Sequence, residues 1–545
     1  MSEMKRKTVF PVRIVRKFGL VSNAESLLSE KPLQITTDEP DCAVFENSGG
    51  VEKAGVLLDF GKEMNAAPRI LTFLTGGARP ARVRIVCGES AQEALSDIGE
   101  KNATNDHALR DYEIRLSPYS DMTFSESGFR FLCIRLESEN AVLRLKAAVA
   151  EAVYRDIPRL GSFRCSDETL NRIDDTAAYT CHLNMQQYIW DGIKRDRLVW
   201  AGDMHPEMLT VRTVFGRQKV FEDSLRFMRD RTPLPGWMNG MPTYSLWWII
   251  MLRDWYMYTG DRDFLAENRE YAVGLSRQIA ALTEPDGEDH LPSYFLDWPC
   301  HGKPQEKEGS RSLLALALKN AVGLALEYGE EALAAECREK AEAVCRVPVN
   351  TYGAKQVAAI SALAGRMDAD AAAEQILSGG ARGFSTFMSF YLLKTAGKKD
   401  MAAALNVLSE YYGGMLDMGA TTFWEDFDVG WLENAAPIDE PVPEGMRDIH
   451  GDNGAYCYKG FRHSLCHGWS SAVTAFLAEE VLGIHILSPG CRKISLRPSI
   501  GSLSYAQGTY PTPLGLLRVF CRRAQDGSTE TEFVAPDGMT VILEK

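Results

Sequence analysis

Residues 166–185 read SDETLNRIDDTAAYTCHLNM, and the apolar spacing of the chain changes its period at this stretch. Leu170, Ile173 and Ala177 recur at intervals of three and four residues, which places them on one face of an α-helix. Ser166 stands directly before this pattern, where a hydroxyl oxygen can accept a hydrogen bond from a free N–H of the first turn. We therefore expect a helix that begins after Ser166 and opens a helical region.

Helical spacing continues from this point to about Gly483. About a dozen helices are expected in the region that contains the first one and 205–230, 244–259, 262–283, 310–328, 330–346, 354–364, 370–378, 383–396, 399–411 and 467–483. Gly216 is expected to split the segment 205–230 into two helices. So many helices joined by short turns suit helical hairpins arranged in a closed ring, although no sequence repeat supports the ring independently.

Strand patterns stand on both sides of the helical region. Short stretches rich in Val, Ile and Leu, separated by turn residues, occur first at 55–61, 81–89, 110–117 and 130–137 and again at 494–500, 514–523, 529–536 and 539–545. The expected architecture is multidomain, with an N-terminal β-sandwich over residues 1–158, a central all-α domain over 159–484 and a small β domain over 485–545.

Composition limits the class of ligand. The chain has 545 residues, 45% apolar and 25% charged, which is typical of a soluble globular protein with sizeable cores. A formal net charge of -14 argues against a nucleic-acid partner, because such proteins carry basic patches that neutralise phosphates. Small neutral or polar ligands fit this charge better. The sequence does not decide whether the protein forms a homo-oligomer.

Cysteine usage and hydropathy bear on the compartment. None of the twelve cysteines forms a CxxC pair, which argues against a zinc ribbon or a redox motif. The first nineteen residues contain no continuous apolar segment, and no later stretch reaches the ~18 apolar residues of a membrane span. We expect no membrane partner, a cytoplasmic location and reduced thiols.

Residues 191–203, DGIKRDRLVWAGD, combine three aspartates, two arginines and a lysine with Trp200. The stretch lies between two predicted helices, so it is read as a loop at the rim of the helical region, where binding residues concentrate. Its charges can be explained as a solvated surface with mutual Arg–Asp pairs. The tryptophan favours a sugar site instead, because a sugar ring stacks its C–H face on indole while its hydroxyls bond to charged groups.

A second acidic and aromatic cluster occurs at 419–431, GATTFWEDFDVGW. It also follows a predicted helix, and it pairs Trp424 with Glu425. A buried aromatic corner with salt-bridged acids is one explanation. The other is glycoside hydrolysis, which requires a protonated carboxyl group for the leaving oxygen and a second carboxylate opposite it.

Four blocks together resemble a known family. DGIKRDRLVWAGD and GATTFWEDFD, followed by HSLCHGWSSAV (463–473) and LGIHILSPGCRKISLRP (482–498), are similar to the bacterial α-L-rhamnosidases of glycoside hydrolase family 78, in the six-hairpin glycosidase superfamily. The resemblance covers most of the chain. It implies a jelly-roll-like N-terminal β-sandwich, a central (α/α)6 barrel and a small C-terminal β-sandwich.

The resemblance also implies roles for individual residues. In that family the acidic residue ahead of Arg-Leu-x-Trp is the general acid, which falls here on Asp196, and the general base that activates water falls on Glu425. The residues implied to contact or line the sugar site are Asp191, Arg195, Trp200, Asp203 and His467.

Two departures from the family pattern leave questions open. The family carries Glu as the acid, whereas this chain has Asp196, so Asp191 stays an alternative general acid. Where the family commonly has an aspartate, the stretch GWMNG (236–240) places Asn239, and a neutral amide makes weaker bonds to sugar hydroxyls than a carboxylate does.

Other aromatic residues complete the predicted site. In SLWWIIMLRDWYMY (245–258), helical spacing predicts that most of the tryptophans are core residues, and we assign Trp248 to the pocket. Trp298, in the loop FLDWPC (295–300), and Trp424 are also assigned to substrate binding. The glycine-rich stretch 450–460 lacks the ligands of a calcium loop, so no metal and no cofactor are expected.

The sequence therefore predicts an inverting glycoside hydrolase that releases terminal α-L-rhamnose from a small carbohydrate or glycoside. Two alternatives stay open. One is a different (α/α)6-barrel glycosidase or phosphorylase with another sugar specificity, and the other is a sugar-binding protein without catalysis.

Overall fold

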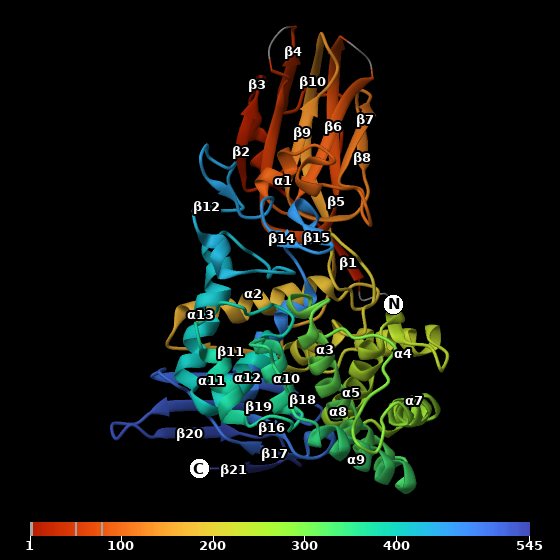
Figure 1. Cartoon of the computed structure of the whole chain (residues 1–545). Coiled ribbons are helices and arrows are strands. Elements are labelled where there is room, and N and C mark those ends of the chain that lie inside the picture. The colour runs from red at the N-terminus through yellow and green to blue at the C-terminus, as the bar shows by residue number, and fades with distance from the viewer. Residues whose placement is uncertain (1–3, 50–51, 78–79, 545) are drawn as a thin grey trace.

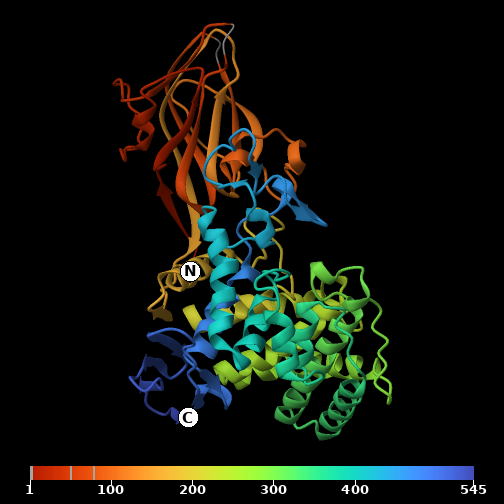
Figure 2. The same ribbon diagram turned by 60° about the vertical axis from the view of Figure 1, so that its left-hand side comes forward.

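The computed structural model describes residues 4–49, 52–77 and 80–544, and Figure 1 shows how three regions follow one another. N-terminal strands form an elongated body at the top of this view, and below it the helices lie beside the C-terminal strands, which are at the lower left. Figure 2, turned about the vertical axis, keeps this arrangement. The expected combination of a helical domain with β regions on both sides is confirmed.

The N-terminal strands form one hydrogen-bonded network. Among the described residues its ten strands are β1 (Met4–Val9), β2 (Arg13–Phe18), β3 (Leu20–Ser22), β4 (Ala43–Asn47), β5 (Gly55–Gly77), β6 (Ala81–Gly88), β7 (Asp111–Leu116), β8 (Asp121–Thr123), β9 (Ser127–Leu136) and β10 (Ala141–Arg155). The main order is β3-β4-β10-β5-β9-β6-β7, while β1 pairs with β10 and both β2 and β8 pair with β5. A short helix, α1 (Ala91–Leu95), follows β6.

The long strand β5 organises this network by changing partners along its length. Its first part pairs with β2 and β9 and its second part with β8 and β10, and the register against β9 shifts between Asp59 and Met64. Such an irregularity bends a strand and lets it pass between layers. Asp59 is buried and pairs with Arg130, whose guanidinium also donates to the carbonyl of Gly419, so β5 and β9 contact the helical region.

The helical region begins one residue later than expected. Helix α2 spans Glu168–Asn184, and the N-cap is Asp167, whose carboxylate accepts hydrogen bonds from the N–H groups of Thr169 and Leu170. Ser166 is not the cap, because its hydroxyl oxygen accepts the N–H of Ser504. The expected apolar face, with Leu170, is buried.

Helices occupy all the segments where helical spacing was found. Within the described residues they are α3 (Met204–Thr210), α4 (Lys219–Arg231), α5 (Pro242–Thr259), α6 (Arg262–Glu267), α7 (Arg269–Ala281), α8 (Pro304–Glu327), α9 (Glu331–Arg346), α10 (Lys355–Leu363), α11 (Ala369–Leu377), α12 (Ser389–Lys399), α13 (Met401–Asp417) and α14 (Val473–Phe476). Gly216, at a φ of 76° that few other residues adopt, separates α3 and its π-helical extension from α4. The predicted split is confirmed.

One segment differs from its prediction. Residues 262–283 form two helices, α6 and α7, because buried Asn268 lies between them with backbone angles outside the helical range. Its side-chain amide donates to the carbonyl of Phe264 at 2.8 Å, which competes with the helical backbone pattern.

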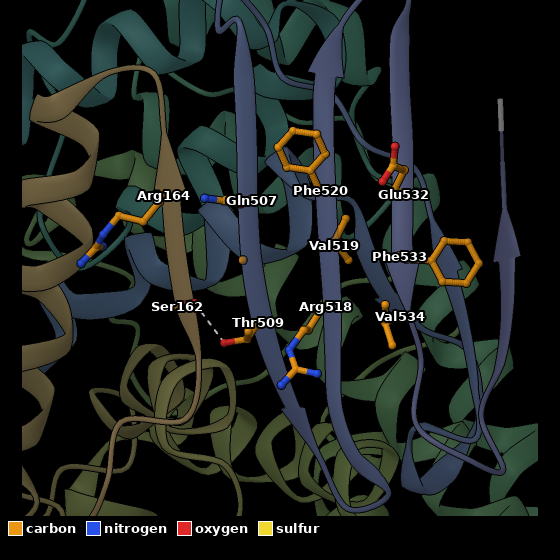
Figure 3. A pocket seen from close by; sticks show the side chains of 11 residues that line it. Ser162, Arg164, Gln507, Thr509, Arg518, Val519, Phe520, Glu532, Phe533 and Val534 are labelled. Carbon is orange, nitrogen blue, oxygen red and sulfur yellow. Dashed lines mark hydrogen bonds between the residues drawn. The ribbon is translucent and has the colours of Figure 1, made fainter.

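One of the C-terminal strands pairs with a strand from the start of the helical region. They are β16 (Ile484–Ile486), β17 (Lys493–Leu496), β18 (Tyr505–Thr512), β19 (Gly515–Arg523), β20 (Thr529–Val534) and β21 (Thr540–Leu543), and β11 (Ser162–Cys165) pairs with β18 at the edge of the sheet β11-β18-β19-β20. Figure 3 shows Ser162 of β11 beside Thr509 of β18, with their hydroxyls 3.0 Å apart. The strand before α2 thus joins this sheet, whereas β16, which follows the last helical segment, pairs with β17 in a second sheet of order β16-β17-β21.

A long segment between α13 and α14 reaches the N-terminal β region. It contains the two-residue strands β12 (Ala435–Ala436), β13 (Arg447–Asp448), β14 (Gly454–Ala455) and β15 (Tyr458–Lys459), and Figure 1 places β12, β14 and β15 beside the lower end of the N-terminal strands. The carbonyl of Ile438 accepts the N–H of Ala91 at 2.8 Å. This contact brings the segment after Glu425 against the N-terminal β region.

Three sequence expectations concern the chain as a whole, namely the state of its thiols, membrane spans and domain boundaries. All twelve cysteines are free thiols. Among the described residues, none of the helices combines the length and the apolar character that crossing a membrane requires. The domain boundaries at 158 and 484 stay predictions.

Candidate active site

A cavity of about 520 Å³ is lined by residues of both the helical region and the N-terminal β region. The lining side chains come from 191–203, 239–244, 293–301, 457–469, Glu425 and the β-region loop that carries His107. Both acidic and aromatic loops predicted from the sequence therefore face the same space.

Asp191 organises the first loop. Its two carboxylate oxygens accept the backbone N–H groups of Asp196 and Leu198, each at 2.9 Å, and its carbonyl accepts the N–H of Gly468 at 2.7 Å. Burial, reinforced by the charge of Asp196, raises the pKa of Asp191 to about 7. This residue holds the loop in shape and ties it to the segment that carries His467.

Arg195 joins the two proposed catalytic carboxylates. One terminal nitrogen of its guanidinium lies 3.0 Å from Asp196 Oδ1, and the other donates to Glu425 Oε1. The arginine is almost fully buried, and the neighbouring Glu425 and Asp196 charges raise its pKa despite the cost of burial. His107 Nε2 lies 3.3 Å from Asp196 Oδ1, so the β region contributes a side chain next to Asp196.

Glu425 is held from several sides. Its second carboxylate oxygen accepts the N–H of Ser464 at 3.1 Å, and its own N–H donates to the Ser464 carbonyl at 2.9 Å. Its backbone carbonyl accepts the indole N–H of Trp469 at 2.9 Å and the hydroxyl of Thr386. A carboxylate fixed in this way is oriented toward the cavity without rearrangement.

His467 stands among the acids. Its Nε2 lies 4.0 Å from Asp191, 3.9 Å from Asp203 and 3.7 Å from Glu425, and its ring stacks on Trp469 at a centroid distance of 4.1 Å. Burial and the nearby Arg195 charge lower the pKa of His467 far below its ordinary value. The imidazole is therefore neutral, and it can exchange hydrogen bonds with a polar ligand.

Asp203 is a buried acid in the wall of the cavity. It accepts a hydrogen bond from the hydroxyl of Tyr244 at 3.0 Å. Burial, and then the charge of Asp191, raise the pKa of Asp203 well above its ordinary value. The ring of Tyr244 also contacts Trp200 edge to face, with centroids 6.0 Å apart, so polar and aromatic surfaces meet at this wall.

Most predicted site residues meet in the cavity. Those that line it are Asp191, Arg195, Asp196, Trp200, Asp203, Trp298, Glu425 and His467. Their roles in binding and catalysis stay predictions. The solvated-surface explanation for 191–203 does not hold for Asp191, Arg195 and Asp203, which are buried.

Two predicted residues lie elsewhere. Trp248 is wholly buried in α5, where its indole N–H donates to the carbonyl of Leu225 and its ring packs on Tyr271. Trp424 turns away from the cavity that its neighbour Glu425 faces, and it packs edge to face on Phe427. Assigning either tryptophan to substrate binding is wrong, because both are core residues.

Several cavity residues were missed from the sequence. Among them are Tyr244, Trp469 and His107. Trp469 lies two residues after His467 in the block HSLCHGWSSAV, so its proximity to a predicted site residue was a usable signal. No local sequence feature marks His107. Asn239, which was singled out, lines the cavity with its amide bound to the backbone at Val199 and Ala201, 3.0 Å from each.

One group of side chains has the donor atoms of a metal site. Within the described parts of the chain, Glu89, Glu93 and His450 place their ligand atoms within 4.8 Å of one another. The ammonium of Lys194 lies 2.9 Å from Glu89 and 3.3 Å from Glu93, and it supplies the positive charge there. The group therefore fits a buried ion-pair cluster.

A protein-family comparison matches residues 158–361 to the bacterial α-L-rhamnosidase six-hairpin glycosidase domain. Among curated proteins, no sequence match is found.

Solved structures with the same fold cover almost the whole chain. A family 78 rhamnosidase of Bacillus sp. GL1 is 22% identical, with a TM-score of 0.75 over 95% of this chain and 55% of that one. A rhamnosidase from Klebsiella oxytoca with rhamnose bound is 18% identical, with a TM-score of 0.65 over 87% and 95%. A Streptomyces avermitilis α-L-rhamnosidase complexed with L-rhamnose is 15% identical, with a TM-score of 0.71 over 99% and 50%.

This chain spans about half the length of the Bacillus and Streptomyces proteins. The matches confirm the resemblance to family 78 α-L-rhamnosidases and six-hairpin glycosidases, and they show that the chain has their fold.

Proposed function

We propose that this protein is an inverting glycoside hydrolase that releases terminal α-L-rhamnose from small glycosides. The observation that carries the proposal is one cavity in which Arg195 contacts both Asp196 and Glu425, two carboxylates from distant segments. Inverting glycosidases need two carboxyl groups, ~6.5–9.5 Å apart, with space for a water molecule. The rhamnose-bound solved structures with this fold support the choice of sugar.

Asp196 and Glu425 divide the chemistry in the proposed reaction. Asp196 acts as the general acid and donates a proton to the leaving glycosidic oxygen. Glu425 accepts a proton from a water molecule that attacks the anomeric carbon from the opposite face, so the released sugar has inverted configuration. Arg195 donates a hydrogen bond to the Glu425 carboxylate and keeps it oriented.

The remaining cavity residues are proposed to bind the sugar. The exposed parts of Trp200 and Trp298 offer apolar surface for the C–H face of the ring. Asp203 and neutral His467 offer hydrogen-bonding groups for the sugar hydroxyls. We place the cavity at one end of an (α/α)6 barrel, with a jelly-roll-like β-sandwich before it and a small β-sandwich after it.

Turnover of 4-nitrophenyl α-L-rhamnopyranoside tests this function. We expect release of nitrophenol that EDTA does not abolish, and proton NMR of the first-formed sugar should show β-L-rhamnose. Cleavage restricted to D-glucosides, or activity lost with EDTA, would contradict the substrate and the metal-free mechanism. Initial appearance of the α anomer would contradict inversion.

Asn239 favours one alternative, a related glycosidase or phosphorylase with another sugar specificity. Its amide is already bound to the backbone at Val199 and Ala201, so the cavity lacks a carboxylate at this position. A panel of nitrophenyl glycosides, assayed with and without phosphate, distinguishes these activities. Calorimetric binding of rhamnose without turnover of any glycoside would instead indicate a sugar-binding protein.

A further inference from the structure

We propose that Glu89, in the N-terminal β region, is a positioning residue that sets the placement of the Asp196 loop relative to Glu425. The inference rests on the proposed function, since it assigns Glu89 to the arrangement of the acid and the base. Glu89 does not line the cavity. Its carboxylate lies behind the site and contacts a residue of each catalytic segment.

The first set of contacts leads to the base. Glu89 Oε2 accepts the N–H of Leu465 at 2.6 Å, and Glu89 Oε1 accepts the hydroxyl of Ser464 at 3.3 Å. The N–H of Ser464 in turn donates to Glu425 Oε2 at 3.1 Å, and the Ser464 carbonyl accepts the N–H of Glu425. The position of the Glu425 carboxylate therefore depends on a backbone segment that Glu89 holds.

The second contact leads to the acid. Lys194 Nζ lies 2.9 Å from Glu89 Oε2, and Lys194 directly precedes Arg195 and Asp196 in the first loop. The same ammonium donates to the carbonyls of Phe461 and His463, at 2.9 and 2.6 Å. One carboxylate oxygen thus receives donors from both segments.

Burial makes these bonds strong constraints. Glu89 is 1% exposed and Lys194 7% exposed, so water cannot replace a lost partner easily. A buried carboxylate that loses a donor keeps its full desolvation cost, which favours the arrangement with all donors in place. The ion pair and its backbone bonds act as one unit.

Glu89 is also fixed on its own side. It lies between β6 and α1, and its N–H donates to the carboxylate of Glu93 at 2.8 Å. At the preceding Gly88, a Cβ atom would lie 2.5 Å from the backbone nitrogen of Ala94, so chain and helix are closely packed. The N-terminal sheet therefore offers a rigid point of attachment.

The sugar-contacting residues are held by other contacts. The N–H of His467 donates to the carbonyl of Phe423 at 3.0 Å, and Tyr244 holds Asp203 at 3.0 Å. A change at Glu89 should therefore affect the alignment of acid and base more than sugar binding. The expected kinetic signature is a fall in kcat with little change in KM.

Glu89→Gln is the test, with Glu93→Gln as the matched control. Both replacements are nearly isosteric, and both remove a carboxylate beside Lys194. The Glu93 side chain has no hydrogen bond to residues 464–465, and the amide oxygen of a glutamine there can still accept the N–H of Glu89. On 4-nitrophenyl α-L-rhamnopyranoside we expect kcat to fall about 10²-fold in Glu89→Gln, as for a catalytic group misplaced by about 1 Å. KM should change less than about threefold, and Glu93→Gln should lose less than about fivefold in kcat.

A folding defect is distinguished by a second variant. If Glu89→Gln fails to fold because Lys194 is left underpaired, the double variant Glu89→Gln/Lys194→Met removes both charges. Glu93 keeps the guanidinium of Arg110 at 3.8 Å, so this variant should restore cooperative unfolding. Its kcat should stay low, because the Leu465 N–H still lacks its carboxylate acceptor. Glu89→Asp should recover part of the lost kcat, since the carboxylate is kept at a shorter reach.

The outcomes separate this inference from the proposed function. Wild-type protein without glycosidase turnover would remove the proposed function and the inference with it. Wild-type turnover combined with full kcat in Glu89→Gln would overturn the positioning role alone. A loss of kcat in Glu93→Gln equal to that in Glu89→Gln, or full kcat in the double variant, would also overturn it.

Discussion

Replacing Asp196 and Asp191 separately by Asn distinguishes the general acid from the residue that holds it. Both side chains line the cavity, and both replacements are nearly isosteric. Asp196 faces Arg195 and His107 with its carboxylate. Asp191 instead uses both oxygens on backbone N–H groups of its own loop. The two variants should therefore fail in different ways.

The expected size of each effect comes from these contacts. Asp196→Asn removes the proton donor, which contributes about 10²–10⁴-fold when the leaving oxygen is a poor leaving group and far less when it is nitrophenolate. In Asp191→Asn one oxygen can still accept an N–H, but the amide group faces the second N–H and the loop must shift. The same loop carries Arg195, which contacts Glu425, so a displacement of about 1 Å also misaligns the base and costs about 10²-fold with either leaving group.

The assay compares kcat and kcat/KM for 4-nitrophenyl α-L-rhamnopyranoside and an alkyl α-L-rhamnoside. We expect Asp196→Asn to slow the alkyl substrate far more than the nitrophenyl one, and Asp191→Asn to slow both about equally. Glu425→Gln is the reference for loss of the base, and it should slow both substrates by similar factors of about 10²–10⁴. Urea unfolding of each variant checks that the protein remains folded.

Leaving-group dependence in Asp191→Asn, together with its absence in Asp196→Asn, would refute this assignment. Asp191 would then be the acid, and the backbone bonds that it accepts would serve to place a proton donor. Equal behaviour of the two variants would contradict the separation of roles altogether.

Two further predictions concern stability and binding. Burial raises the pKa of Asp297 to about 7, above the ~3.9 of the unfolded chain, so its stabilising contribution is present below about pH 4 and lost as pH rises through 7. In urea unfolding, the free energy of unfolding of Asp297→Asn should rise relative to that of wild type by about 2–3 kcal/mol between pH 5 and pH 8. A difference between the two proteins that stays constant over this range would contradict the pKa shift. Trp248→Ala should lower the free energy of unfolding by about 3–5 kcal/mol without raising KM. Trp298→Ala should raise KM. A raised KM in Trp248→Ala, with an unchanged KM in Trp298→Ala, would place Trp248 at the sugar.

The helical region was predictable from the sequence because its signal is local. The spacing of Leu170, Ile173 and Ala177 is a property of one helix, and so is the break at Gly216. The N-cap was misplaced by one residue, since Ser166 and Asp167 can both cap a helix and the choice depends on Ser504, far along the chain. The exact ends of a helix depend on contacts with distant residues more than the existence of the helix does.

The two tryptophan errors have the same physical origin. Trp248 lies in an apolar run and Trp424 beside acidic residues, and in neither case could composition alone tell which side of the backbone faces the cavity. Trp248 is buried all round because α5 lies within the helical core, and Trp424 points opposite to Glu425. Burial of a given side chain depends on the packing of neighbouring elements.

The sequence by itself determined the order of β and helical regions, the two acidic and aromatic loops and the resemblance to family 78, since each depends on residues close together in the chain. Only the tertiary structure decided that both loops share one cavity, with Arg195 contacting Asp196 and Glu425. It also brought His107 and Glu89 of the N-terminal β region to that site. No local pattern predicts these contacts, because they form only when distant segments pack and their buried charges must find partners.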